Sequence, residues 1–177
     1  MRIFHVALLI AAFAANLHAQ GTLIFNNRFS TNIFAPVFDV DGVTMLSGTN
    51  YFAQLYAGPL GTAESALVAV GKPVPFRTDK GAGSWRTTEV TVPSVRSGER
   101  GTVQVRVWFN RGGALKSYEA ALAEGALHGK CPPFPSLPLG GGMGLPPGII
   151  NNSRATNNLP PIVCTAGKEP AGVPQQR

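Results

Sequence analysis

The segment at residues 101–110 constrains the fold more than any other part of the chain. Its side chains alternate strictly between two sets, with Val103, Val105, Val107 and Phe109 in one set and Gln104, Arg106 and Trp108 in the other. Alternation with a period of two is typical of a β-strand, because successive side chains point to opposite faces of a sheet. The pattern predicts a strand whose valine face is buried.

Short β-prone runs of the same kind recur along the chain, separated by Gly, Pro, Asn and Asp. The predicted strands span residues 22–26, 35–40, 51–57, 66–70, 87–92 and 102–110. Several short strands with turn residues between them are typical of a sandwich. The strand at 51–57 carries large apolar side chains on both sides, which indicates a central position. We therefore expect an all-β fold, a small antiparallel β-sandwich.

One short helix is predicted over residues 118–124. Ser117 is a suitable N-cap, Glu119 lies in the first turn where the helix dipole favours an acid, and Gly125 follows the last turn. The inner face of this helix is expected to carry Tyr118, Ala121 and Leu122.

The N-terminus has the pattern of a signal peptide at residues 1–19. Arg2 precedes an apolar run at residues 3–15, and Ala19 is a small residue at the expected cleavage point. A core helix or a membrane anchor is the alternative, but the run is too short to cross about 30 Å of hydrocarbon. We expect an exported protein, extracellular or periplasmic, that begins at Gln20 or Gly21 and has no membrane span after cleavage.

The composition changes abruptly after Cys131. Residues 132–177 hold ten of the fifteen prolines, a run of three glycines and a single aromatic residue, Phe134. Such a segment has little to bury, so we expect a sandwich domain at residues 20–131 and a disordered Pro/Gly-rich tail at 132–177. A shift of reading frame in the coding sequence near Cys131 is a second explanation of the change.

The two cysteines, Cys131 and Cys164, would reach an oxidising compartment after export. A disulfide between them is therefore one possibility, and two unpaired thiols are the other. The residues leave this choice open.

The charge is basic but dispersed. The formal net charge is +6, and removal of Arg2 with the signal peptide leaves 14 basic against 9 acidic residues. Nucleic-acid-binding surfaces usually gather their basic residues on one face or helix, so no nucleic-acid partner is expected. Weak attraction to anionic polymers or surfaces is more compatible with this distribution.

No motif predicts catalysis, a metal or a cofactor. Asp39 and Asp41 place two carboxylates about 7 Å apart at a strand end, but a calcium site would need more oxygen ligands and a glycosidase pair would need one raised pKa. A strand that ends in an Asp-Gly turn is the favoured interpretation. His128 is expected in a solvated loop near the helix end. The glycines at residues 81–86 lack the third glycine of a dinucleotide loop.

Trp108, Arg106 and Gln104 form the candidate ligand-binding surface. An exposed indole stacks on sugar rings, and the two polar side chains would bind hydroxyl or acidic groups. Trp85 and Tyr56 would extend such a platform. The alternative is that the helix or a second sheet covers Trp108, which the high average burial of tryptophan favours.

Four sequence blocks resemble those of a family of uncharacterised exported bacterial proteins, many of which carry a PEP-CTERM sorting tail. The blocks span residues 35–42, 48–59, 103–108 and 117–121. The resemblance covers roughly residues 20–131 and implies a secreted all-β domain of unknown function without known catalytic residues. The sorting tail itself is missing, since Lys168, Glu169 and Pro170 are followed by seven residues and no apolar span.

Together these patterns predict an exported, non-enzymatic domain with a structural or binding role at a cell surface or in an extracellular matrix. Its expected partners are extracellular polysaccharides or surface proteins. The alternatives are a polysaccharide-binding module that uses Trp108, Arg106 and Gln104, and a hydrolase that uses Asp39 and Asp41.

Overall fold

The computed structural model describes residues 19–30, 33–141, 146–149 and 162–163. All of the predicted signal peptide except Ala19 lies outside these residues, as does Cys164. No helix in the described part is long and apolar enough to span a membrane.

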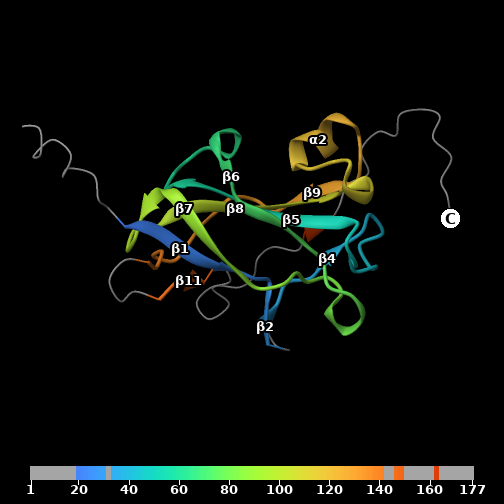
Figure 1. The fold of residues 1–177 in the computed structure, drawn as a ribbon, viewed down its shortest axis with the longest axis horizontal. Helices are drawn as coiled ribbons and strands as arrows, with labels where there is room; N and C mark the ends of the chain where they lie inside the picture. Colours follow the sequence, from blue (N-terminus) through green and yellow to red (C-terminus); the bar gives the residue numbers. More distant parts are fainter. Residues whose placement is uncertain (1–18, 31–32, 142–145, 150–161, 164–177) are drawn as a thin grey trace, which may run out of the picture.

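Two sheets face each other, and the prediction of a small, mainly antiparallel β-sandwich is confirmed (Figure 1). The first sheet has the order β11-β1-β7, with β1 at Gln20–Phe25, β7 at Thr88–Arg96 and β11 at Gly148–Ile149. The second has the order β10-β8-β5-β6, with β5 at Tyr51–Pro59, β6 at Val68–Pro75, β8 at Gly101–Phe109 and β10 at Phe134–Pro135. Strand β9, at His128–Lys130, also pairs with β8. As predicted, the strand that begins at Tyr51 is central, because β5 lies between β8 and β6.

The remaining elements are short. Two further strand pairs join β2 (Arg28–Ser30) to β3 (Ile33–Phe34), and β4 (Val37–Phe38) to β12 (Ile162–Val163). In the described residues the helices are α2 at Tyr118–Ala123 and three 3-10 turns, η2 at Glu64–Ala66, η3 at Asp79–Gly81 and η4 at Arg111–Gly113.

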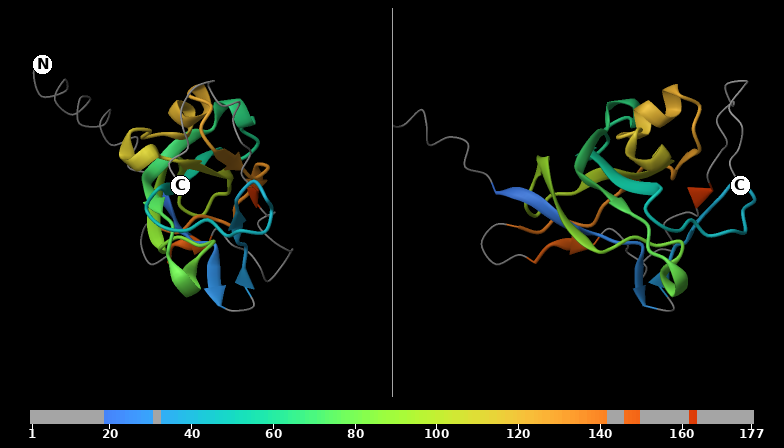
Figure 2. Two further views of the ribbon diagram at one scale, coloured as in Figure 1. Left: turned by 90° about the vertical axis from the view of Figure 1, so that its right-hand side faces the viewer. Right: turned by 45° about the vertical axis from the view of Figure 1, so that its right-hand side comes forward.

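Both faces of β8 are buried, which corrects the prediction of a single buried face. Val103, Val105 and Val107 pack in the core between the sheets, against side chains of β1 and β7. Trp108 lies on the other face, in a second apolar cluster with Tyr118 of α2. The helix folds over the outer face of the second sheet, as the two views of Figure 2 show. The alternation therefore identified the two faces correctly, but a distant segment covers the outer one.

Helix α2 begins as predicted. The hydroxyl oxygen of Ser117 accepts a hydrogen bond from the amide of Ala120 at 3.1 Å, so this serine is the N-cap. Tyr118 and Ala121 are buried, but Leu122 is 51% exposed and the prediction for it is wrong. The helix has six residues and contacts the sheet along one narrow stripe. Leu122 lies about 100° further round the axis than Ala121, beyond that stripe.

The start of the Pro/Gly-rich segment is packed, not disordered. Strand β10 pairs with β8 in the register Phe134–Val103, Ser136 is buried, and Leu139 is 2% exposed in the main core. The prediction of a disordered tail from residue 132 is therefore wrong for residues 132–141. Proline is excluded from central strands but is compatible with an edge, and β10 is the edge strand. Most of residues 142–177 lie outside the described part.

Candidate functional site

The sequence-predicted binding residues lie together on the outer face of the second sheet, below α2. They belong to a group of polar side chains that we call the Arg106 cluster, which consists of Tyr56, Glu64, Gln104, Arg106, Glu119 and Lys130. These residues come from β5, η2, β8, α2 and β9, and so join five elements of the fold.

Trp108 does not form an exposed stacking platform. Its side chain is fully buried, and its indole nitrogen donates a hydrogen bond to the Leu115 carbonyl at 3.0 Å. The ring packs edge-on against Phe52, with 5.7 Å between ring centroids. Gln104, Trp85 and Tyr56 are buried as well, so no member of the expected aromatic surface is available to a sugar ring. The exposed binding face is therefore absent, and the alternative that the high burial of tryptophan favoured is confirmed, because α2 and the loop before it cover Trp108.

Arg106 is half-buried at the centre of the cluster, with every nitrogen of its guanidinium in use. The group lies 3.9 Å from the centroid of the Tyr56 ring, a cation–π contact. Its Nη1 forms an ion pair with Glu119 at 3.2 Å, and its Nη2 donates to the Glu64 carbonyl at 3.2 Å. Its Nε donates to Gln104 Oε1 at 2.8 Å. Arg106 thus links η2 and α2 to β8 and β5.

Two acids of the cluster, Glu64 and Glu119, are also bound to neighbours. Lys130 forms an ion pair with Glu64 and, as the main cause, holds the pKa of that carboxyl below its usual value. The Tyr56 hydroxyl donates to both carboxylate oxygens of Glu119, at 2.8 and 2.9 Å, and burial raises the pKa of Tyr56. A general acid needs a raised carboxyl pKa, the opposite of the shift at Glu64. The cluster therefore serves to hold α2 and η2 against the second sheet.

Asp39 and Asp41 lie in an exposed turn that precedes Leu46. The Asp41 carboxylate accepts hydrogen bonds from the amides of Val43 and Thr44 at 2.9 and 2.8 Å. Hydrogen bonds from Thr44 and these amides lower the pKa of Asp41. Gly42 has φ +67°, so the favoured prediction of an Asp-Gly turn is confirmed. In the described part of the chain, no group of three or more potential ligands gathers in a geometry suited to a metal ion.

Cys131 and His128 lie in the segment after α2. Cys131 is a buried thiol whose sulfur accepts a hydrogen bond from the Val105 amide at 3.2 Å, and burial raises its pKa to about 11. Cys164 lies outside the described residues, and a disulfide between the two cysteines stays a prediction. His128 is in strand β9 and not in a solvated loop, with its Nδ1 2.8 Å from the Ala126 carbonyl oxygen and its ring edge-on to Tyr118.

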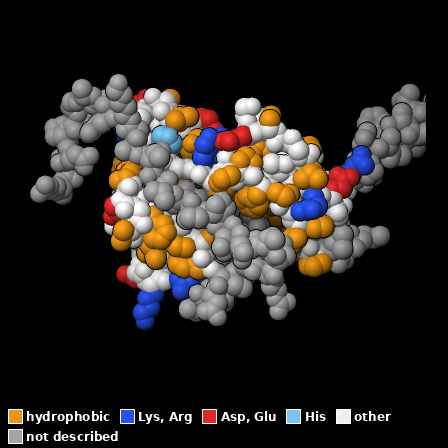
Figure 3. Space-filling model, turned by 180° about the vertical axis from the view of Figure 1, so that it is seen from behind, with side chains coloured by type: hydrophobic (Ala, Val, Ile, Leu, Met, Phe, Trp, Pro, Cys, Tyr) orange, Lys and Arg blue, Asp and Glu red, His pale blue; other side chains and the backbone are white. Residues whose placement is uncertain are grey.

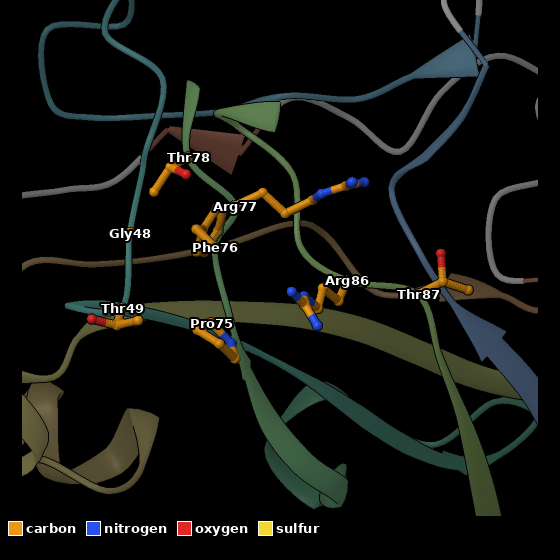
Figure 4. A pocket seen from close by; sticks show the side chains of 8 residues that line it. All are labelled: Gly48, Thr49, Pro75, Phe76, Arg77, Thr78, Arg86 and Thr87. Carbon is orange, nitrogen blue, oxygen red and sulfur yellow. The ribbon is translucent and has the colours of Figure 1, made fainter. Parts of the chain in front are cut away.

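A second candidate site is an open hollow of about 960 Å³ that the sequence did not reveal. We call it the Arg77–Arg86 hollow; it is lined by Gly48, Thr49, Pro75, Phe76, Arg77, Thr78, Arg86 and Thr87 (Figure 4). Phe76 and Trp85 form an antiparallel bridge, and both side chains are buried. Alternation along the two segments therefore directs Arg77 and Arg86 outward. This alternation about Phe76 and Trp85 is the signal in the sequence that could have identified the site.

The two arginines of the hollow differ from Arg106 in their surroundings. Both are exposed, and neither has an ion pair or a side-chain hydrogen bond within the described part of the chain. In Figure 4 the Arg86 side chain extends toward the wall that holds Pro75, and the Arg77 side chain extends toward the opposite wall. The hollow therefore offers two cationic groups that no residue of the described part neutralises.

Basic side chains are scattered on the face opposite to that of Figure 1. Figure 3 shows Lys and Arg side chains separated by apolar and uncharged surface, some of them beside acidic ones, on the described part of this face. The distribution there agrees with the dispersed charge of the sequence.

No protein-family model, curated protein or solved structure matches the chain. The resemblance to exported proteins with PEP-CTERM tails thus stays a prediction from the sequence blocks.

Proposed function

We propose that the chain is an exported, non-enzymatic β-domain with a binding or structural role at a cell surface or in an extracellular matrix. The N-terminal pattern of Arg2, an apolar run and Ala19 supports export. The role itself is inferred from how the polar side chains of the fold are used.

The observation that carries the proposal is the contrast between the Arg106 cluster and the Arg77–Arg86 hollow. In the cluster, Glu64 and Glu119 are the acids that come together, and each is bound to a cation of the same fold. In the hollow, two exposed cations have no such partner in the described residues. Groups that are held by the fold stabilise it, whereas groups left at an open surface are available to a partner.

Polysaccharide binding is the more specific form of this proposal. Of the residues that the sequence predicted for it, Trp108 and Gln104 are buried and Arg106 is bound within the fold, whereas the arginines of the hollow are exposed and support binding there. The hydrolase alternative at Asp39 and Asp41 has less support, because Asp41 caps its own turn and its pKa is lowered.

Export is tested by expressing the tagged chain in a bacterial host, with the variant Leu9→Arg as the control that interrupts the apolar run. We expect the wild-type chain outside the cytoplasm with Gln20 or Gly21 at its N-terminus, and the variant retained with Met1. A wild-type chain that stays in the cytoplasm uncleaved contradicts export.

Binding is tested by affinity electrophoresis of the exported chain through gels that contain neutral or acidic polysaccharides. Retardation in one of the gels supports polysaccharide binding, and no retardation in any gel leaves the structural role. Release of reducing sugars from any of these polymers contradicts the non-enzymatic proposal.

A further inference from the structure

The walls of the Arg77–Arg86 hollow are held in place by contacts with the core. Phe76 and Trp85 anchor two of the walls, since both are buried and their rings lie edge-on with centroids 5.9 Å apart. The Arg77 amide donates to the Ser84 carbonyl at 2.8 Å, which closes the loop between these walls. The backbone that carries both arginines is therefore preorganised, and preorganisation lowers the entropic cost of binding a ligand.

The third wall, around Gly48 and Thr49, is fastened to the same loop. The Gly83 amide donates to the Leu46 carbonyl at 2.7 Å, and the Ser47 hydroxyl lies 3.4 Å from the Arg77 carbonyl oxygen. On its other side, the Asn110 side-chain amide donates to the Thr49 carbonyl at 2.6 Å. The hollow is thus a fixed feature of the fold, although its rim is exposed.

The charge of the hollow favours an anion. An arginine guanidinium presents a planar set of donors that match a carboxylate or a sulfate. Asp79 is the acid that follows Thr78 in this loop, and its carboxylate accepts a hydrogen bond from the Thr78 hydroxyl at 3.0 Å. It is not among the residues that line the hollow. Anionic groups of a ligand would therefore find the two guanidinium groups available.

The size and lining favour a sugar polymer over a single small anion. A volume of about 960 Å³ is far larger than one carboxylate or sulfate needs. Thr49, Thr78 and Thr87 are among the lining residues, and a threonine hydroxyl is able to exchange hydrogen bonds with sugar hydroxyls. Pro75 adds an apolar surface on which the C–H face of a sugar ring can lie.

We propose that the Arg77–Arg86 hollow binds an acidic polysaccharide, with Arg77 and Arg86 holding its anionic groups and the threonine hydroxyls contacting its sugar hydroxyls. This inference rests on the proposed binding role and assigns that role a surface and a ligand class. Carboxylate and sulfate share the chemistry that an arginine recognises, so the test separates these two sources.

The test is affinity electrophoresis at fixed ionic strength in gels of polygalacturonate, dextran sulfate or neutral dextran. We expect the wild-type chain to be retarded by one or both acidic polymers and not by dextran. The double variant Arg77→Gln/Arg86→Gln should bind at least about tenfold more weakly, the loss expected when charge-assisted hydrogen bonds are removed. Retardation by polygalacturonate identifies carboxylate as the recognised group, and retardation by dextran sulfate alone identifies sulfate.

The matched control is Arg96→Gln/Lys116→Gln, which removes two exposed positive charges outside the hollow. It should keep most of the wild-type affinity. Circular dichroism and urea denaturation of both double variants show whether each is folded. Changes in the NMR chemical shifts of the backbone amides, measured when a galacturonate oligosaccharide is added to the wild-type chain, locate the contact without a substitution.

The outcomes separate the failure of the site from that of the function. If a folded Arg77→Gln/Arg86→Gln variant binds like the wild type, or if the control loses as much affinity, the hollow is not the site while polysaccharide binding stands. If no polymer retards the wild-type chain, polysaccharide binding fails and the inference fails with it.

Discussion

At the scale of single residues, Arg106 shows how a surface-type residue becomes part of the fold. Its aliphatic stem crosses a buried face while its guanidinium contacts Tyr56, Gln104 and Glu119. Partly buried charges of this kind are costly to leave unpaired, so each contact supports the others. The residues that looked like a binding surface are thus the ones that hold α2 in position.

Trp108→Ala should destabilise the protein by about 3–5 kcal/mol, because it removes a fully buried ring from the cluster under α2. Urea denaturation followed by circular dichroism measures the loss. Leu122→Ala, at an exposed position of α2, is the control and should change stability by less than about 0.5 kcal/mol. A stable Trp108→Ala variant that has lost polysaccharide binding would instead place this indole at the surface.

Glu64→Gln should reduce the dependence of stability on pH in the acid range. The ion pair with Lys130 lowers the folded-state pKa of Glu64 below the ordinary value of 4.5. Its contribution is therefore present above about pH 4.5 and is lost as the pH falls through the lower folded-state pKa. We therefore expect the free energy of unfolding of the wild type, measured by urea denaturation, to exceed that of Glu64→Gln by less at about pH 3 than at pH 7.

The control for that measurement is Glu89→Gln, which removes one exposed acid that forms no ion pair in the described part of the chain. If the free energy of unfolding of the wild type exceeds that of Glu64→Gln by the same amount at both pH values, the Glu64 carboxylate has no role in the ion pair.

At the scale of elements, the segment at 128–141 completes the second sheet. Strand β9 pairs with β8 from Arg106 to Trp108, and β10 pairs with it at Thr102 and Val103. The Cys131 amide, between the two strands, donates to the Val105 carbonyl at 3.1 Å. The prolines interrupt this edge without removing it, so the side of β8 that faces away from β5 is paired along much of its length. An unpaired edge there would invite aggregation.

Leu139→Ala should destabilise the protein by about 2–4 kcal/mol, since Leu139 is buried in the main core next to Gly21. Equilibrium denaturation measures the loss. Leu60→Ala, at an exposed position, is the matched control. Equal stability of Leu139→Ala and the wild type would mean that this segment does not pack, as its composition alone suggests.

At the scale of the whole molecule, the second sheet lies between two apolar clusters. The larger one fills the space between the sheets, and the smaller one lies under α2. Strands β5 and β8 contribute to both clusters, so their backbone amides should be among the slowest to exchange hydrogen with the solvent. The Arg77–Arg86 hollow lies where β6 ends. Its two arginines follow Phe76 and Trp85, which belong to the larger cluster and hold these segments in place.

The reactivity of Cys131 should report global opening. Its thiol is buried beside β8 and its pKa is raised to about 11, and both effects suppress the thiolate. In a Cys164→Ser variant, where Cys131 is the one thiol, labelling by a thiol reagent should follow the fraction unfolded across a denaturant series. Fast labelling of the native variant at neutral pH would contradict this burial.

The sequence by itself determined the local features of the protein. The alternation at 101–110, the apolar character of 51–57, the Ser117 N-cap and the Asp-Gly turn at Gly42 are all present in the structure. Each depends on residues that are close along the chain, because strand period, capping and turn conformation are set by neighbouring groups.

Tertiary structure alone decided which faces are covered and which side chains remain free. The pattern that puts Gln104, Arg106 and Trp108 on one face does not say that α2 covers that face, nor that Lys130 reaches Glu64 across 66 residues of sequence. Composition after Cys131 suggested disorder, yet Leu139 finds a place in the core. Burial depends on contacts between distant segments. The alternation about Phe76 and Trp85 is present in the sequence, but only the structure shows that these two side chains are buried and that Arg77 and Arg86 line one hollow.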